Sequence, residues 1–169
     1  MKKSIVYLTL FASALGLMAR GAEAGGKSCT ALVVSSDGNP GHGKTSFSVA
    51  SDPVLHFHLV VPASAQIDKE DQVNIQIGTP NGYLYQSIDL PVAPAGSKET
   101  QRQLRGYPLP VNVQTFAKVN GNGNGAMHVQ GTIPVAGSTI ESFSLYGKWS
   151  AQASLGNGNP CSASFTMKQ

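Results

Sequence analysis

Charged residues are scarce in this chain of 169 residues, because Lys, Arg, Asp and Glu together account for 12% of it. The formal net charge is +3, but the first 24 residues hold three of the 12 basic side chains and only one of the 9 acidic ones. Nucleic-acid binding needs clustered Lys and Arg to displace counterions. The remaining chain is almost neutral, and its one basic cluster, at 98–105, is interrupted by Glu99. The composition therefore gives no electrostatic reason to expect nucleic acid as a partner.

Long apolar runs are lacking after the first one, which covers residues 5–19. That run follows Lys2 and Lys3 and precedes Ala22-Glu23-Ala24, which is the layout of a secretory signal peptide. Its core of about 15 residues is short for a membrane-spanning helix. We predict a signal peptide at 1–24 and one mature domain at 25–169, exported to the periplasm, the cell surface or the medium. No cysteine stands at the predicted cleavage point, so lipid attachment there has no acceptor.

Recognisable catalytic motifs are lacking as well. No G-x-S-x-G sequence marks a nucleophile elbow, and spacing alone specifies no arrangement of Ser, His and Asp. The few carboxylates are scattered and form no obvious pair for glycoside hydrolysis. We therefore expect a protein that is not an enzyme and that needs no cofactor.

The mature part consists of short runs of Val, Ile, Thr, Phe and Tyr separated by Gly, Pro, Asn and Asp. This pattern predicts β-strands joined by turns. Alternation places Leu55, Phe57 and Leu59 on one strand face, which is predicted to be core. The same alternation through 143–155 and 161–167 predicts a terminal hairpin. The predicted strands cover residues 30–36, 44–50, 54–61, 72–79, 83–90, 112–119, 127–135, 142–155 and 161–168.

Two segments do not fit the strand pattern. Residues 93–106 are predicted to be either a short helix capped by Ser97 or a polar crossover between two sheets. The repeated Asn-Gly pairs at 120–125 predict a flexible loop tip, because both residue types tolerate positive φ.

The chain has two cysteines, Cys29 and Cys161. In an exported protein the economical interpretation is one disulfide, because compartments outside the inner membrane are oxidising. Each cysteine lies at the start of a predicted strand, at a position whose side chain points toward the core. They would meet if the first and last strands were parallel neighbours. The alternative is a pair of buried free thiols.

The sequence GNPGHGKT at 38–45 fits the phosphate-binding pattern G-x-x-x-x-G-K-[ST] position for position. A working loop of this type follows a buried strand and leads into a helix whose N-terminus faces the phosphates. Here Thr45 is followed by an alternating stretch that ends at Pro53, which is typical of a strand. We therefore interpret the segment as a Gly-rich turn between two strands and expect no nucleotide binding.

Histidines supply the second candidate site. His56 and His58 are two residues apart in a predicted strand, so they share the face opposite Leu55, Phe57 and Leu59. Two imidazoles in this spacing can chelate Cu²⁺ or Zn²⁺ if a third ligand arrives from a neighbouring strand, and His128 is a candidate for it. The alternative is a pair of solvent-facing histidines on an antiparallel sheet.

Two C-terminal stretches, IPVAGSTI at 133–140 and SLYGKW at 144–149, resemble the penultimate hairpin of immunoglobulin-like sandwich domains in bacterial exported and cell-surface proteins. The cysteines depart from antibody-type domains, where the bridge joins the middles of two facing sheets. The resemblance implies a single antiparallel, immunoglobulin-like β-sandwich of about eight or nine strands in the all-β class, in which the first strand can pair in parallel with the last. It also implies a non-catalytic module for protein binding, adhesion or assembly, whose partner is a protein or a surface polymer of the envelope. The alternative function is periplasmic binding of Cu or Zn through His56, His58 and His128.

Overall fold

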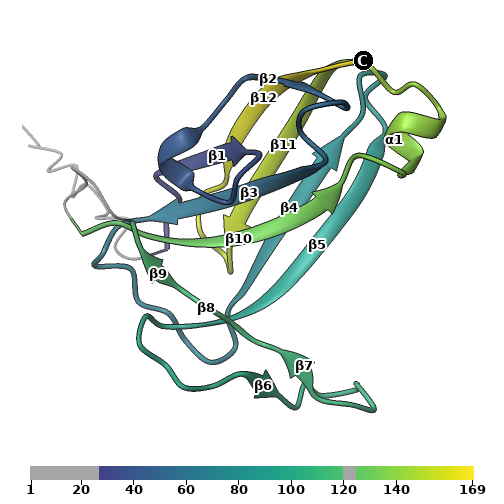
Figure 1. Cartoon of the computed structure of the whole chain (residues 1–169). Helices are drawn as coiled ribbons and strands as arrows, with labels where there is room; N and C mark the ends of the chain where they lie inside the picture. Colours follow the sequence, from purple (N-terminus) through teal and green to yellow (C-terminus); the bar gives the residue numbers. More distant parts are fainter. Residues whose placement is uncertain (1–26, 120–124) are drawn as a thin grey trace, which may run out of the picture.

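A computed structural model of the chain describes residues 27–119 and 125–169, and Figure 1 shows how they are arranged. The predicted signal peptide and most of the Asn-Gly stretch lie outside these described residues. Two larger sheets lie on opposite sides of one hydrophobic core, so the all-β prediction is confirmed. No helix in the described part of the chain is both long and apolar enough to cross a membrane.

The first sheet has four strands in the order β1-β3-β10-β9, and every neighbouring pair is antiparallel. The second has six strands in the order β2-β12-β11-β4-β5-β8, with parallel pairing of β2 to β12 and of β5 to β8. A separate two-stranded arm, β6-β7, extends at one end of the molecule (Figure 1). The strands are β1 (Ala31–Ser35), β2 (Ser46–Ser48), β3 (Val54–Val61), β4 (Gln72–Gly78), β5 (Leu84–Ala93), β6 (Gln101–Arg102), β7 (Val111–Asn112), β8 (Gln114–Thr115), β9 (Ala117–Lys118), β10 (Met127–Pro134), β11 (Gly147–Leu155) and β12 (Cys161–Lys168).

The core lies between the two sheets, where the inward-pointing apolar side chains of each sheet pack against one another. Leu55, Phe57 and Leu59 of β3 are fully buried, as alternation predicted. From the opposite sheet, Phe165 packs on Phe57 with ring centroids 5.9 Å apart, and Trp149 stacks on Phe165 at 6.1 Å. This cluster joins the two layers, because burial of large aromatic side chains is a major source of core stability.

The start of the terminal hairpin differs from the prediction. The alternation through 143–155 predicts that Phe143 points into the core, but its side chain is 71% exposed. The chain there forms a one-turn helix, α1 (Thr139–Ser142), with Ser138 as its N-cap, so β11 begins only at Gly147. From Trp149 onward, the predicted alternation holds through the buried side chains of the strand.

The neighbours of the first and last strands also differ from the expectation. β1 pairs with β3, whereas β2 is the parallel neighbour of β12. The chain changes sheets between β1 and β2 through a loop that contains a 3₁₀ turn, η1 (Pro40–His42).

Residues 93–118 contain no helix of the kind that Ser97 was predicted to cap. The predicted strand at 112–119 is divided into β7, β8 and β9. The division arises because these short strands pair with three different partners, namely β6, β5 and β10.

Candidate functional site

The middle of the outer face of the six-stranded sheet carries a continuous set of uncharged polar side chains, with Asp89 of β5 and Lys148 of β11 beside it. It forms because Ile75, Ile77, Ala151 and Ala153 point into the core, and the residues between them must point outward. We call this surface the polar face. It consists of Asn74, Gln76, Ser87, Ser150, Gln152, Ser154, Ser162 and Ser164.

Strand register arranges the polar face in rows. Gln76 lies opposite both Gln152 of β11 and Ser87 of β5, and Gln152 lies opposite Ser162 of β12. With neighbouring strands about 4.8 Å apart, this four-strand row is about 14 Å long. The result is an extended line of amides and hydroxyls and not a deep pocket.

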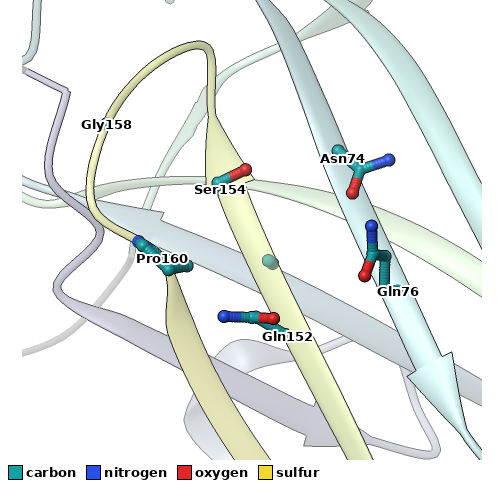
Figure 2. A pocket seen from close by; sticks show the side chains of 7 residues that line it. Asn74, Gln76, Gln152, Ser154, Gly158 and Pro160 are labelled. Atoms are coloured by element: carbon teal, nitrogen blue, oxygen red, sulfur yellow. The ribbon is translucent and has the colours of Figure 1, made fainter.

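Three shallow hollows lie along this side of the sheet. The first has a volume of about 190 Å³ and is lined by Gln76, Gln152 and their neighbours (Figure 2). The second, of about 380 Å³, lies over Gly78, where a Cβ would come within 2.7 Å of Ser150 Oγ. A side chain at position 78 would therefore fill part of this hollow.

The third hollow, of about 370 Å³, lies where the sheet meets the β6-β7 arm. Tyr107 lines it and is 58% exposed. Arg102 holds this arm, because its guanidinium donates to the backbone oxygen of Val92 over 3.0 Å and pairs with Glu99 over 2.7 Å. Among all the residues that line the three hollows, Asp89 is the one with a charge.

Most polar-face side chains have no hydrogen-bond partner within the described residues. Asn74 is an exception, because its amide donates to Ser87 Oγ over 3.0 Å and to Asp89 Oδ1 over 2.6 Å. The donors and acceptors of the others are open to solvent or to a ligand. These unpaired side chains are Gln76, Ser150, Gln152, Ser154, Ser162 and Ser164.

The histidines lie on the outer face of the other sheet. His56 and His58 share that face of β3, as predicted, and their ring centroids are 6.3 Å apart. His128 comes from β10, and its Nδ1 is 3.4 Å from Nδ1 of His58. Nε2 of His58 is 2.9 Å from the hydroxyl of buried Ser35.

This histidine face is not solvent-facing, because the loop between β1 and β2 covers part of it. His58 is fully buried, and a Cβ at Gly38 would lie 3.5 Å from the His56 ring. Glycine at position 38 also permits a φ of +74°. Beneath this loop, His56 Nδ1 and Gln130 Oε1 are buried without a hydrogen-bond partner among the described residues.

Burial, together with the smaller effects of the neighbouring His128 and His56, lowers the pKa of His58 to about 4. Burial also lowers the pKa of His128. Both imidazoles are therefore neutral at pH 7, as metal ligands must be. Across the described ranges, however, no three His, Cys, Asp or Glu side chains converge in a way that could hold a metal ion.

Residues 38–45, whose sequence fits the phosphate-binding pattern, connect β1 to β2 as predicted. Thr45 is followed by β2, not by a helix. Lys44 Nζ contacts Asp52 Oδ1 over 2.9 Å and donates to Ser36 Oγ over 2.9 Å. Burial opposes ionisation of Asp52, but hydrogen bonds from Ser48 N–H, Ser36, Lys44 and Ser51 outweigh it and lower its pKa to about 2. Lys44 is therefore the ion-pair partner of the buried Asp52 carboxylate.

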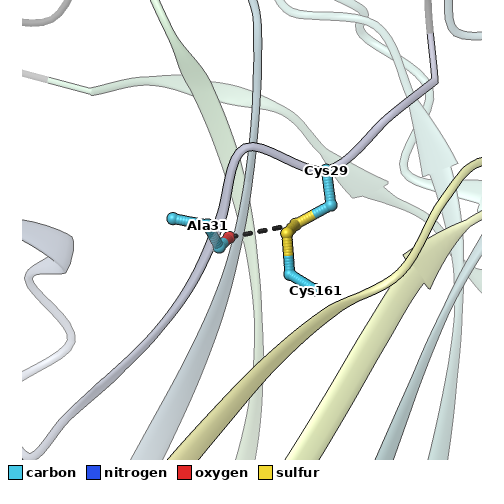
Figure 3. Close-up of a disulfide and its surroundings, with 3 residues drawn as sticks. All are labelled: Cys29, Ala31 and Cys161. Carbon is cyan, nitrogen blue, oxygen red and sulfur yellow. Dashed lines mark hydrogen bonds between the residues drawn. A yellow bond between two sulfur atoms is a disulfide. The ribbon is translucent and has the colours of Figure 1, made fainter. Parts of the chain in front are cut away.

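The predicted disulfide between Cys29 and Cys161 is confirmed, with Cα atoms 5.6 Å apart (Figure 3). It joins the chain just before β1 to the first residue of β12, and thus ties one sheet to the other. The backbone supports this connection, because Cys29 N–H donates to the oxygen of Asn159 over 3.2 Å. The bridge therefore connects the start of β1 to the start of β12, although these two strands are not hydrogen-bonded neighbours.

Sequence reasoning singled out the histidines and the Gly-rich segment, but it missed the polar face. The available signal was the identity of the outward residues in the predicted strands, which are Ser, Asn and Gln where Lys and Glu are common on exposed sheets. Comparison of this chain with known protein families, curated proteins and solved structures finds no match.

Proposed function

We propose that this protein is an exported, non-catalytic binding module of the cell envelope or cell surface, and that it contacts its partner through the polar face. The observation that carries this proposal is the row of unpaired amides and hydroxyls above shallow hollows. Such a surface can form many hydrogen bonds along an extended partner, and no nucleophile with a positioned base accompanies it among the described residues.

The strand order supports an immunoglobulin-like sandwich as the scaffold. The order β1-β3-β10-β9 corresponds to strands A-B-E-D, and β4-β11-β12 corresponds to C-F-G. The switch of the chain from β1 in one sheet to β2 beside β12 also agrees with a first strand that pairs in parallel with the last. Domains of this architecture present faces and end loops for binding in many unrelated proteins.

The disulfide supports export, because such bonds persist in oxidising compartments. Removal of the predicted signal peptide should leave Gly25 as the first residue. N-terminal sequencing of protein recovered from the envelope or the medium tests this step, and retention of residues 1–24 would contradict it.

The metal-binding alternative has weaker support than the polar face. His58 and His128 approach each other closely, but a third ligand within reach of both is not found in the described residues. The hydrogen bond between His58 and Ser35 fits a buried polar cluster equally well.

The proposed function can be tested by retention of the purified, oxidised mature domain on envelope fractions from the cells that produce it. Ser150→Arg combined with Ser162→Arg places two bulky charges on the polar face and should abolish retention. Thr132→Arg is the matched control, because Thr132 is exposed on the outer face of the other sheet. Equal retention of the wild-type protein, the double arginine variant and Thr132→Arg would refute the polar face as the contact surface.

A further inference from the structure

We propose that the ligand of the polar face is a neutral polysaccharide, bound along the row formed by Ser162, Gln152, Gln76 and Ser87. This inference rests on the proposed function and names the chemical class of its partner. The argument draws on charge, on hydrogen-bonding capacity and on the exposed aromatic side chain at one end of the face.

Charge is the first discriminating property. Lys and Arg are absent from the linings of the three hollows, and Asp89 is their one charged residue. Two cations lie at the margins of the polar face. Lys148 precedes Ser150 on the outward side of β11, and Lys44 lines a further hollow of about 310 Å³ with Ser162, although its ammonium is paired with a buried carboxylate. An anionic polymer lying along the row would meet no cation within it, and its approach to Asp89 would be repulsive. A neutral ligand meets no such penalty, and the Asp89 carboxylate already accepts a hydrogen bond from Asn74.

The polar face also lacks the apolar centre that is typical of protein–protein interfaces. Such interfaces are built around desolvated aromatic and aliphatic anchors. Gln76, Gln152 and Ser162 occupy the middle of this face. The large exposed apolar side chains that line its hollows, Leu84 and Tyr107, lie at its borders. A protein partner would bury these amides without placing an apolar anchor between them.

A sugar matches the hydrogen-bonding capacity of the row. Each Gln amide offers two donors and one acceptor oxygen, and each Ser hydroxyl both donates and accepts. Sugar hydroxyls do the same, so a single chain can satisfy successive side chains across four strands. The side chains of Gln76 and Gln152 are ready for this role, because they lie opposite each other and have no internal partner in the described residues.

Tyr107 supplies a ring at the end of the polar face. It lines the third hollow beside Gln72 and Asp89, and most of its surface is exposed. The face of an aromatic ring is apolar and has a negative electrostatic potential, so the C–H groups of a sugar can stack on it. The chain would therefore extend from the serines of β12 toward the β6-β7 arm.

Affinity gel electrophoresis tests the inference with the oxidised mature domain. The gels contain hydroxyethylcellulose, dextran or galactomannan as neutral probes, and polygalacturonate as an anionic probe. We expect retardation in at least one neutral gel and none in polygalacturonate. The variant Q76A/Q152A should bind at least about fivefold more weakly, because two hydrogen bonds are lost.

Gln66→Ala is the matched control, because Gln66 is exposed outside the polar face and should leave binding unchanged. Tyr107→Ala should weaken binding without changing the thermal midpoint. Equal affinity of wild-type protein and Q76A/Q152A, or the absence of retardation in every neutral gel, would overturn the inference. Sedimentation equilibrium that shows a dimer dissociated by Q76A/Q152A would also overturn it, since the occupant would then be a second copy.

Treatment of the envelope fraction separates this inference from the proposed function. Periodate destroys vicinal diols of glycans and should abolish retention, whereas protease should leave retention intact. Loss of retention after protease alone would overturn the polysaccharide inference while the polar face remained a binding surface. Retention that resists Ser150→Arg and Ser162→Arg would overturn both.

Discussion

Acidification from pH 7 to pH 4 is expected to destabilise the fold through His58. Burial lowers the pKa of this imidazole to about 4, from an ordinary value of 6.5. Between these two values the unfolded chain binds a proton that the folded protein does not bind. The free energy of unfolding therefore falls as the pH falls through this window.

The magnitude follows from the size of the pKa difference. One pKa unit corresponds to 1.36 kcal/mol, so His58 alone should remove about 2 kcal/mol at pH 5 and about 3 kcal/mol at pH 4. His128 adds to the loss in the same direction, because burial lowers its pKa as well. Asp52 affects stability in a separate, lower pH range. Its pKa in the folded protein is about 2, below the ordinary 3.8, so its contribution to stability is lost only as the pH falls from 3.8 toward 2.

Urea unfolding of the oxidised mature domain at pH 7, 6, 5 and 4.5 measures this effect. His58→Gln keeps a polar group beside Ser35 without a titrating ring, so its stability should depend less on pH. His42→Gln is the control, because His42 is an exposed histidine of the β1–β2 loop. The reasoning is refuted if wild-type protein and His58→Gln lose the same free energy between pH 7 and pH 4.5.

Three further predictions concern the scaffold. Replacing Cys29 and Cys161 by alanine should lower the free energy of unfolding by about 5 kcal/mol in the chain-entropy model, because the bond closes a loop spanning 132 residues; urea unfolding checks the loss. Trp149→Ala should cost about 3–5 kcal/mol, whereas Phe143→Ala should cost less than about 0.5 kcal/mol, and equal thermal shifts would contradict this contrast. Lys44→Ala should cost about 1 kcal/mol by removing a partner of a buried carboxylate, while calorimetry with ATP and Mg²⁺ should detect no micromolar binding before or after the change.

The strands that were predicted best are those whose two faces differ most. β3 and β12 match the predicted ranges 54–61 and 161–168. Apolar and polar residues alternate along the whole of β12, whereas in β3 the alternation covers 55–59 and prolines at 53 and 62 mark the ends. The disulfide could also be predicted, since two cysteines in a chain with a predicted signal peptide leave one intramolecular pairing. The antiparallel pairing of β11 with β12 agrees with the predicted terminal hairpin. The neighbours of β1 and β2 could not be predicted, because they depend on the crossing of the chain from one sheet to the other.

The error at Phe143 came from extending an alternating pattern through a local helix signal. Ser138 and Glu141 form an S-x-x-E capping sequence. In the structure, Ser138 Oγ accepts from Ile140 N–H over 3.1 Å, and Glu141 accepts from Gly137 N–H over 2.6 Å. These local hydrogen bonds prevail over strand propensity and leave the Phe143 side chain outside the core.

The two outer faces of the molecule show why parity alone did not identify the candidate site. Parity predicts that His58 and Gln76 both point outward, and the structure agrees for each. His58 is nevertheless buried beside Ser35 and His128, whereas Gln76 stays exposed, a difference that arises from tertiary packing. Burial makes His58 a neutral and pH-sensitive element of stability, whereas the exposed amides keep their hydrogen-bonding capacity for a ligand. An external partner can therefore reach the uncharged row directly, whereas the His58 side chain is fully buried.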